Sequence, residues 1–490
     1  MTHASRAAPG ASLPNIVLIM PDDMGWGDIA AHGNPLIQTP NLDRLYRESV
    51  RFTDFHVSPT CAPTRSALMT GRHEFKNGIT HTILERERMT LKATTLAQVL
   101  KSAGYATGIF GKWHLGDEEP YQPQNRGFDE VFIHGAGGIG QTYPGSGGDA
   151  PDNKYFDPAI LHNGTFVKTK GYCTDVFFSQ ALEWIAGKTK GDAPFFAYIT
   201  PNAPHGPLIS PGAQYDKLYT GKEIDGKQLE EGDVAYYAMI TNVDENVGKA
   251  LAKLKEWGIE NDTLVIFLSD NGGTHTRLYS GGYRAGKGSM YSGGTHAPSF
   301  WRWPERFQGG VDCPALSAHL DVLPTLAEIV GAQLNGDLAK QVEGRSLLPL
   351  LENPKAKWPD RTLVTHVGRW PRGQAAQSKH ANSSIRDSRF RLVADRELYD
   401  LKSDPGETKN VIDQHPEAVA KLRAAYDQWW DDVQPLLVNE DAIGPKINPF
   451  KALYWKQFGG GPDEALRKRM DPAQQNEPPA KAKKAKAKQA

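Results

Sequence analysis

Cysteine is scarce in this chain of 490 residues, which has three cysteines, at positions 61, 173 and 313. Three widely separated cysteines do not make the disulfide framework of a small secreted domain. We expect Cys173 and Cys313 to be small buried apolar residues, which is the ordinary environment of an unpaired cysteine. Cys61 differs because it lies in a polar turn that contains prolines, within the segment SPTCAPTRSALMTG (58–71). Its context therefore makes Cys61 a candidate functional residue.

Long hydrophobic runs are also missing. No apolar run approaches the roughly 20 residues that a helix needs to cross a bilayer, so membrane insertion is not expected. Residues 1–15, MTHASRAAPGASLPN, lack the apolar stretch of a signal peptide. We expect the protein either to be cytosolic or to have had a leader removed or replaced.

A strong charge of one sign is absent as well. The formal net charge is −1, so no global field would recruit nucleic acid or an acidic membrane. Hydrophobic residues make up 39% of the chain and charged residues 23%, which is typical of a soluble globular protein. The composition therefore favours an ordinary folded protein with ample core rather than a nucleic-acid-binding one.

The pattern of apolar residues predicts two domains and a tail. Over the first 330 residues, apolar runs at 16–20, 105–110, 195–200 and 264–268 alternate with helical patterns such as 177–186, 234–257 and 319–330. This alternation predicts an α/β fold with a largely parallel sheet. Further on, short strands at 389–393 and 397–401 and a helix at 416–430 predict a smaller α+β domain with an antiparallel sheet. We expect domains at 14–355 and 356–460, a disordered Lys/Ala-rich tail at 461–490, and a functional or mobile glycine-rich loop at 135–151.

Polar side chains follow each of the four predicted strands of the first domain. In chain order they are Asp22, Asp23, Lys112, His114, His205, Asp270 and Asn271. In open α/β sheets, ligands bind beyond the carboxyl ends of the strands, so parallel strands would bring these seven residues together. A single such aspartate is more often a turn or cap residue, and a single histidine or lysine is usually structural or solvated. The whole set is hard to explain as turns.

The chemistry of the set indicates a metal ion and an anionic substrate. Carboxylate and amide oxygens are hard ligands that suit Ca²⁺ or Mg²⁺, and the lysines and histidines suit an anion. A thiolate is a soft ligand and matches such a site poorly. If Cys61 belongs to the site, it should act through oxygen, as it would after oxidation to an aldehyde whose hydrate offers two hydroxyls. One hydroxyl can attack and the other can later expel the bound group, while Arg65, one helical turn along, would lower the pKa of the attacking hydroxyl.

These motifs resemble a known family. CAPTRSALMTGRH resembles the type I sulfatase signature, C-x-P-x-R followed by a threonine-glycine-basic turn, with Thr64 at a position where serine is commoner. The resemblance continues, in order, through PDDMGWGD, GKWHLG, PHGP, SDNGG, GKGSMYSGGTHAP and ELYDLKSDPGETKN. It covers most of the chain, and agreement of this many ordered motifs is highly specific.

The resemblance implies a fold, a modification and a set of roles. In that family a maturation enzyme converts the cysteine to formylglycine before folding, and the fold is alkaline-phosphatase-like with a smaller C-terminal domain. The implied ligands of one calcium ion are Asp22, Asp23, Asp270, Asn271 and modified Cys61. The implied residues around the sulfate are Arg65, Lys112, His114, His205 and Lys287, with His205 protonating the leaving oxygen and His114 taking the proton of the second hydroxyl. Bacterial enzymes of this kind are often periplasmic or extracellular.

The same residues allow three other interpretations. Residues 281–287 spell G-x-x-x-x-G-K, but Gly288 follows where a phosphate-binding loop has Ser or Thr, and no clear strand precedes it, so a nucleotide enzyme is rejected. Formylglycine-dependent phosphonate monoester or phosphodiester hydrolases share the cysteine signature and remain an alternative. A calcium-stabilised binding protein with unmodified Cys61 is disfavoured, because a complete set of catalytic residues would have no reason to stay together.

The sequence gives little information about which sulfate ester is the substrate. The segment HVGRWPRGQ (366–374) stands where the smaller domain begins. Arg369, Trp370 and Arg372 could line the rim of the pocket, with the indole stacked on a sugar and the arginines on a neighbouring acid or sulfate. This arrangement would suit an anionic glycan. A surface loop with a packed tryptophan explains the same residues equally well.

Overall fold

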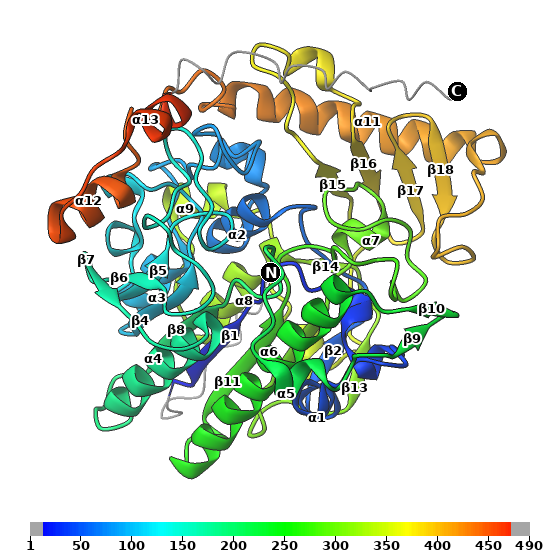
Figure 1. The fold of residues 1–490 in the computed structure, drawn as a ribbon. Coiled ribbons are helices and arrows are strands. Elements are labelled where there is room, and N and C mark those ends of the chain that lie inside the picture. The colour runs from blue at the N-terminus through cyan, green and yellow to red at the C-terminus, as the bar shows by residue number, and fades with distance from the viewer. Residues whose placement is uncertain (1–12, 472–490) are drawn as a thin grey trace, which may run out of the picture.

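Residues 13–471 are described by a computed structural model of the chain, whose largest element is a ten-stranded sheet (Figure 1). Across the sheet, the strands are β13 (Val311–Cys313), β2 (Val50–Phe52), β12 (Ser299–Arg302), β11 (Thr263–Leu268), β1 (Asn15–Ile19), β8 (Phe195–Thr200), β4 (Ala106–Lys112), β5 (Glu130–His134), β6 (Ala159–His162) and β7 (Thr165–Lys168). The neighbours from β11 to β5 are parallel, whereas β12 and β6 run antiparallel to them. The mixed, largely parallel sheet of the sequence prediction is confirmed.

The four strands predicted for the first domain are adjacent at the centre of this sheet, in the order β11, β1, β8 and β4. All three pairings are parallel. Their carboxyl ends therefore share one edge of the sheet, which is the arrangement that the strand-end argument requires. Strand β4 extends to Lys112, beyond the predicted end of the apolar run.

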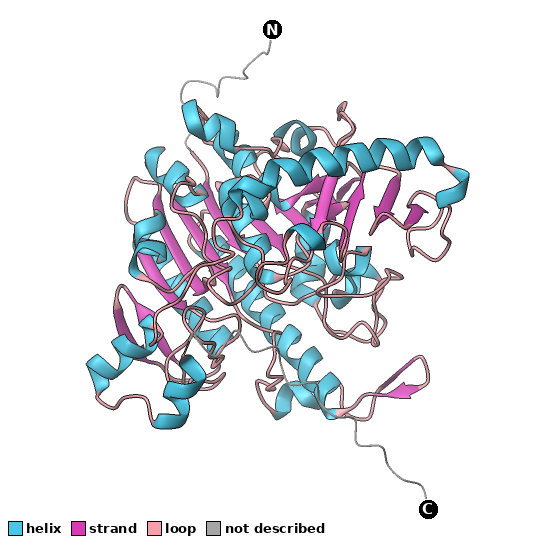
Figure 2. Cartoon of the chain, turned by 90° about the horizontal axis from the view of Figure 1, so that it is seen from above, coloured by secondary structure: helices cyan, strands magenta, loops and turns pink. Residues whose placement is uncertain are grey.

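Helices lie against both faces of the ten-stranded sheet, as Figure 2 shows with the strands in magenta and the helices in cyan. In β1, Ile16 and Leu18 point into one core and Val17 and Ile19 into the other, because successive side chains of a strand alternate. The first core includes residues of α2 (Cys61–Thr70), α3 (Leu96–Ser102) and α8 (Val322–Ile329), and the second includes residues of α1 (Pro40–Glu48), α4 (Cys173–Lys188) and α6 (Glu231–Glu256). A strand buried on both faces needs the continuous apolar run that the sequence shows.

Cys173 and Cys313 lie in these two cores, each with 0% exposure. Neither is in a disulfide. The prediction that both are small buried residues is confirmed.

The second sheet is antiparallel and consists of β15 (Leu363–His366), β16 (Ser383–Arg386), β17 (Phe390–Val393) and β18 (Glu397–Asp400). Helix α11 (Pro416–Val433) lies along it, in orange at the top of Figure 1. Apolar residues of the sheet and the helix, among them Leu398 and Leu422, form a separate core. The predicted antiparallel sheet is confirmed, and β15 and β16 are strands that the sequence pattern did not reveal.

The end of the described chain returns to the first domain. Helix α12 (Pro449–Phe458) packs against β7, where Tyr454 contacts Phe166 and Gln457 hydrogen-bonds its backbone. Residues expected in the smaller domain thus pack on the ten-stranded sheet. Helix α13 (Glu464–Met470) lies in the segment expected to be a disordered tail, and residues 472–490 of that tail lie outside the described residues. Within residues 13–471, no helix is long and apolar enough to cross a membrane.

Candidate active site

Cys61 is the first residue of helix α2, at the end of the helix that carries the positive end of its macrodipole. Its side chain is buried, with 3% exposure, and Arg65 follows one turn later on the same face. Thr64 donates its hydroxyl hydrogen to the carbonyl of Ser58, 3.1 Å away. A serine hydroxyl could make the same bond, which explains how threonine is accommodated at this position.

Four oxygen-bearing side chains meet beside Cys61, from the ends of the adjacent strands β1 and β11. The backbone N–H of Asp23 donates to Oδ1 of Asp270 over 3.1 Å, and Nδ2 of Asn271 donates to Oδ1 of Asp23 over 2.9 Å. Ligand atoms of Asp22, Cys61 and Asp270 all lie within 4.8 Å of one another. The two strand ends and the start of α2 therefore build a single cluster.

Each carboxylate of the cluster has its own cation. Lys112 Nζ lies 2.6 Å from Asp22 Oδ2, and Lys287 Nζ lies 2.5 Å from Asp23 Oδ1. Arg65 donates to Asp270 Oδ2 through Nε and Nη2, at 3.1 and 2.8 Å. This alternation of acids and cations is buried, since the side chains of Lys112, Asp22 and Asp270 are all 0% exposed.

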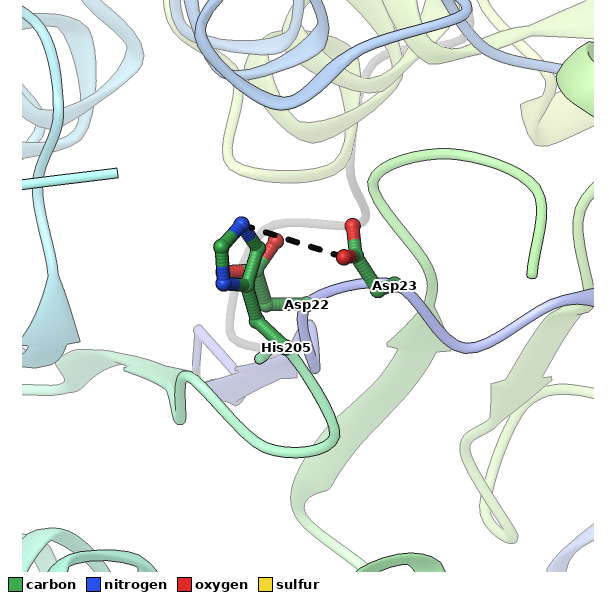
Figure 3. A group of neighbouring side chains, drawn as sticks. All are labelled: Asp22, Asp23 and His205. Atoms are coloured by element: carbon green, nitrogen blue, oxygen red, sulfur yellow. Dashed lines mark ion pairs between the residues drawn. The ribbon is translucent and has the colours of Figure 1, made fainter. Parts of the chain in front are cut away.

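The two predicted histidines flank the cluster. Figure 3 shows the ring of His205 over Asp22, with Nε2 facing Asp23 Oδ2 at 3.8 Å. Nε2 of His114 donates to the carbonyl of Thr82 over 2.7 Å, and its Nδ1 is buried without a hydrogen-bond partner among the described residues. Nε2 of His114 is therefore bound to a carbonyl, whereas Nε2 of His205 faces a carboxylate.

The glycine-rich loop 135–151 lies against both histidines. A Cβ on Gly138 would come within 2.6 Å of His205 Nδ1, and one on Gly137 within 3.0 Å of His114 Cε1. A side chain at Gly138 would therefore force the His205 ring to move, and one at Gly137 would press on the His114 ring. The loop, expected from its composition to be functional or mobile, thus borders the site.

Burial and crowded charge set the electrostatics. Burial raises the pKa of Asp22 well above its usual value, and the charge of Asp270 raises it further, against Lys112. For Asp270, burial also raises the pKa, but Arg65 and Lys112 lower it to below its usual range. Burial likewise raises the pKa of the Cys61 thiol, but the nearby lysines, Lys112 foremost, bring it below the usual value. Burial lowers the pKa of both histidines.

A cation fits this set of residues. Oδ1 of Asp22 and Oδ1 of Asn271 are buried and have no hydrogen-bond partner among the described residues, although buried polar atoms are normally paired. These are hard oxygens next to two further carboxylates, which is the ligand chemistry of Ca²⁺ or Mg²⁺. A second group, Asp22, Asp23 and His205, would include an imidazole, which also suits zinc. The oxygen-rich group is the better match for calcium.

The three residues predicted at the substrate rim lie in different environments. Arg369 is exposed and donates through Nη2 to Thr82 Oγ1, 3.0 Å away, next to the carbonyl that binds His114. Arg372 donates to the carbonyl of Ala442 over 2.6 Å, and its side chain is 26% exposed. Both guanidinium groups are within reach of solvent, and Arg369 is linked to His114 through one residue, Thr82.

Trp370 lies differently from its two neighbours. It is 4% exposed, packs edge-on against Phe75 with ring centroids 5.4 Å apart, and donates through Nε1 to Glu440 over 2.5 Å. Arg86 covers its ring, 5.1 Å from the centroid. The ring has no free face for a sugar in this arrangement, so its position corresponds to the packed tryptophan rather than to the stacking one.

Two further groups of the site, on Thr200 and Thr82, have no distinctive pattern in the sequence and were not predicted. Thr200 accepts from Nη1 of Arg65 through its hydroxyl, and the carbonyl of Thr82 accepts from His114. Thr200 is the last residue of β8, so the strand-end rule that singled out Asp22 could have found it. Nothing marks Thr82, because every residue has a carbonyl.

Comparison with known proteins identifies the family of the chain. The sulfatase family model matches residues 14–332, and the model of the N-sulphoglucosamine sulphohydrolase C-terminal region matches residues 284–429. The chain is 32% identical to human arylsulfatase A over 451 residues, which cover 81% of this chain and 83% of that protein. It is 31% identical to rat N-acetylgalactosamine-6-sulfatase over 376 residues, 70% of this chain and 67% of that protein.

A solved structure gives the same result for the fold. The crystal structure of Ps i-CgsB in complex with k-i-k-neocarrahexaose matches with a TM-score of 0.75 and 26% identity, over 91% of this chain and 97% of that one. The fold is that of the alkaline phosphatase superfamily. Within it, the chain belongs to the sulfatase family, whose members hydrolyse sulfate esters and typically use a metal ion and formylglycine. The protein is therefore a sulfuric ester hydrolase.

Proposed function

We propose that this sulfatase hydrolyses the sulfate ester of a carbohydrate, with Cys61 acting after its conversion to formylglycine. The observation that supports the modification most directly is a buried cysteine placed among hard oxygens, which a thiol does not match as a ligand. The hydrated aldehyde of formylglycine would supply one hydroxyl that attacks sulfur and a second that later expels the sulfate. The sugar-containing names of two relatives support the carbohydrate class.

We further propose calcium as the metal, held by Asp22, Asp23, Asp270, Asn271 and modified Cys61. The unpartnered oxygens of Asp22 and Asn271 support this choice. When bound, calcium would add positive charge next to the reacting group and help to hold it. The carboxylate of Asp270 also holds Arg65, so one residue links the metal ligands to the cation that follows Cys61.

The cations of the site would then bind the sulfuryl group. Lys112 and Lys287 each contact one carboxylate oxygen, and an ammonium has three donors, so further N–H groups remain for the oxygens of the sulfate. Donors that are already oriented in a buried site stabilise the charge that develops in the transition state, which is the largest catalytic contribution in many enzymes. Arg65 is held by Asp270, Thr200 and the carbonyl of Lys112, so it needs no rearrangement.

The two histidines would have opposite roles. Nδ1 of His205 contacts the carbonyl of Gly206 at 2.8 Å, so Nδ1 carries a proton and Nε2 is free to carry a second one. Burial lowers the pKa of His205 and Asp23 opposes that shift, so the imidazolium is a ready proton donor, and we assign His205 as the acid for the leaving oxygen. Nε2 of His114 must donate to the Thr82 carbonyl, which leaves Nδ1 as an acceptor. His114 is therefore the proposed base for the second hydroxyl.

Two measurements test the proposal. Mass spectrometry of the peptide that contains Cys61 should show an aldehyde, trappable by hydrazine reagents, when the protein is made together with a formylglycine-generating enzyme. Active protein that contains only the free thiol would contradict the modification.

The second measurement tests the substrate class. A panel of sulfated mono- and oligosaccharides, aryl sulfates, phosphonate monoesters and phosphodiesters should give the highest kcat/KM on a sulfated carbohydrate. A higher value on phosphodiesters would favour the alternative hydrolase.

A further inference from the structure

Lys287 reaches the site from a segment that has little structure of its own. The Lys287 segment, defined here as residues 284–292, is irregular until α7 (Ser292–Thr295) begins, and Ala285 has a positive φ of 64°. The main domain holds it through the backbone N–H of Lys287, which donates to Gly273 over 3.1 Å, and that of Gly288, which donates to Pro59 over 2.7 Å. These two bonds fix the backbone at the lysine, and the N–H of Gly293, which donates to the carbonyl of Arg284 over 2.9 Å, closes the loop that carries it.

The other side of the Lys287 segment contacts the C-terminal motif, defined here as residues 397–410, ELYDLKSDPGETKN. Nη1 of Arg284 donates to the hydroxyl of Tyr399 over 2.7 Å. At the far end of the segment, the hydroxyl of Tyr291 donates to Glu397 Oε2, also over 2.7 Å. The guanidinium of Arg284 covers the ring of Tyr291, 3.9 Å from its centroid. The motif thus contacts the segment on both sides of Lys287, at Arg284 and at Tyr291.

A buried ion pair between Arg391 and Glu407 adds further contacts between the motif and the segment. Glu407 Oε2 accepts from the backbone N–H of Ser292 over 2.7 Å, and the carbonyl of Glu407 accepts from Arg284 over 3.1 Å. Arg391, on β17, lies 3.3 Å from Glu407 and donates to the carbonyl of Met290 over 3.1 Å. Both side chains of the pair are at most 1% exposed. A buried ion pair adds little net stability compared with apolar residues, so its use here is best sought in geometry.

We propose that Glu407, Glu397 and Tyr399 are positioning residues for Lys287, so that the four-stranded sheet sets the place of a sulfate-binding cation in the other domain. This inference rests on the proposed role of Lys287. None of the three residues touches the catalytic cluster, and each acts through the Lys287 segment. The motif resembling the sulfatase family at the end of the second sheet then has a catalytic consequence, although it lies far along the chain from Cys61.

The test combines variants in the motif with variants of Lys287. Glu407→Gln removes the charge facing Arg391, and Tyr399→Phe removes only the hydroxyl, which accepts from Arg284 and donates to Glu397 over 2.7 Å. Asp400→Asn is the matched control, because Asp400 lies in the same motif but pairs with Arg389 at 2.8 Å and has no contact with the Lys287 segment. Each variant is made in wild-type protein and with Lys287→Ala, and kcat/KM is measured with thermal stability and with hydrogen exchange of peptides covering the segment.

We expect Glu407→Gln to lower kcat/KM about tenfold and Tyr399→Phe less, within the roughly 10²-fold that a displacement of about 1 Å can cost. Exchange of the Lys287 segment should become faster in both variants and remain unchanged in Asp400→Asn. In the Lys287→Ala background, the same substitutions should change kcat/KM less than about twofold, because residues that act through one group are not additive.

Losses that persist in full in the Lys287→Ala background would overturn the proposal, as would equal exchange in all three variants. If Glu407→Gln does not fold, Tyr399→Phe carries the same comparison with an uncharged, nearly isosteric change. Full activity of Lys287→Ala itself would instead contradict the proposed role of Lys287. The two failures are therefore distinguishable.

Discussion

The two sheets of the molecule use the ends of their strands in different ways. Parallel strands β1, β4, β8 and β11 end at one edge, and the residues that follow them carry the chemistry of the site. The second sheet is antiparallel, so its successive strands end at opposite edges, and their side chains pack on α11 or pair with the Lys287 segment. The ends of the first sheet, with the start of α2, hold most of the proposed site residues, whereas the second sheet contacts the segment that carries Lys287.

The difference teaches where sequence patterns are informative. Residues after a buried parallel strand are confined to one edge, so a run of apolar residues followed by Asp or His carries positional information. In the sequence, Glu407 cannot be told from an acidic residue on the surface. Only the fold shows that it is 0% exposed and accepts a hydrogen bond from the backbone of Ser292. Substitutions in the two regions should therefore differ in kind as well as in size.

The largest effect is expected at Cys61. Cys61→Ser should permit no more than a single turnover, because a serine hydroxyl could accept the sulfuryl group but has no second hydroxyl to expel it. Cys173→Ser is the control, since this buried cysteine is bonded to Asn202 outside the catalytic cluster and serine can keep that bond. Pre-steady-state assay of released alcohol should show a burst without turnover for Cys61→Ser. Sustained turnover by Cys61→Ser would contradict the proposed mechanism.

The metal site comes next. Asp23→Ala removes a proposed ligand and the partner of Lys287, so we expect kcat/KM to fall by roughly 10³-fold or more, as loss of several kcal/mol of charge stabilisation implies. Elemental analysis of active protein should find calcium at about one ion per chain. Stoichiometric zinc would show that the imidazole-containing group, not the oxygen cluster, holds the metal. Asp400→Asn, in the second sheet, should leave the metal content unchanged.

His205 separates proton donation from charge binding. A sugar alkoxide needs a proton in order to leave and nitrophenolate does not, and general acid catalysis is typically worth about 10² to 10⁴ in rate. His205→Ala should therefore lose activity on a carbohydrate sulfate by a factor in that range and lose less on nitrophenyl sulfate. Lys112→Ala should affect both substrates alike, because the sulfuryl charge is the same. Equal losses for His205→Ala on both substrates would mean that His205 binds sulfate instead.

The smallest catalytic effect is expected at Trp370, where the second sheet was predicted to reach the substrate. Trp370→Ala should lower the free energy of unfolding by about 3 to 5 kcal/mol, as truncation of a buried aromatic residue does, and change the kcat/KM of the folded protein little. Denaturant unfolding and steady-state kinetics measure the two quantities. A large increase in KM without loss of stability would show that the indole stacks on the sugar. Arg369→Ala, at an exposed neighbour, provides the comparison.

The centre of the fold could be predicted from the sequence, and its edges could not. A strand covered on both faces, such as β1 or β11, must be apolar throughout and is therefore visible as a run. The strands at the margins are short, and their partners are distant in the chain. Strand β2, for example, pairs with β12 and β13, which lie some 250 residues further on. Nothing local in Val50–Phe52 indicates those partners.

The same contrast holds within the site. The structure brings Asp22, Lys112, His205 and Asp270 together, because each is tied to the end of a central strand. The contact of Gly138 with His205 depends on the path of a long loop, which no periodic pattern describes. Trp370 illustrates the limit for side chains, since an aromatic residue between two arginines suits a binding site and a core equally well until its exposure is known.

If Cys61 is modified as proposed, its burial makes folding and modification compete for the same unfolded chain. The side chain is 3% exposed at the start of a helix whose ten residues are all buried, so a modifying enzyme cannot grasp it once α2 has packed. The yield of active protein should then depend on the rate of folding relative to the rate of modification, and not on the stability of the final fold. Chains that fold first would be trapped as well-structured, inactive molecules, and only unfolding would return them to the pool that can still be modified.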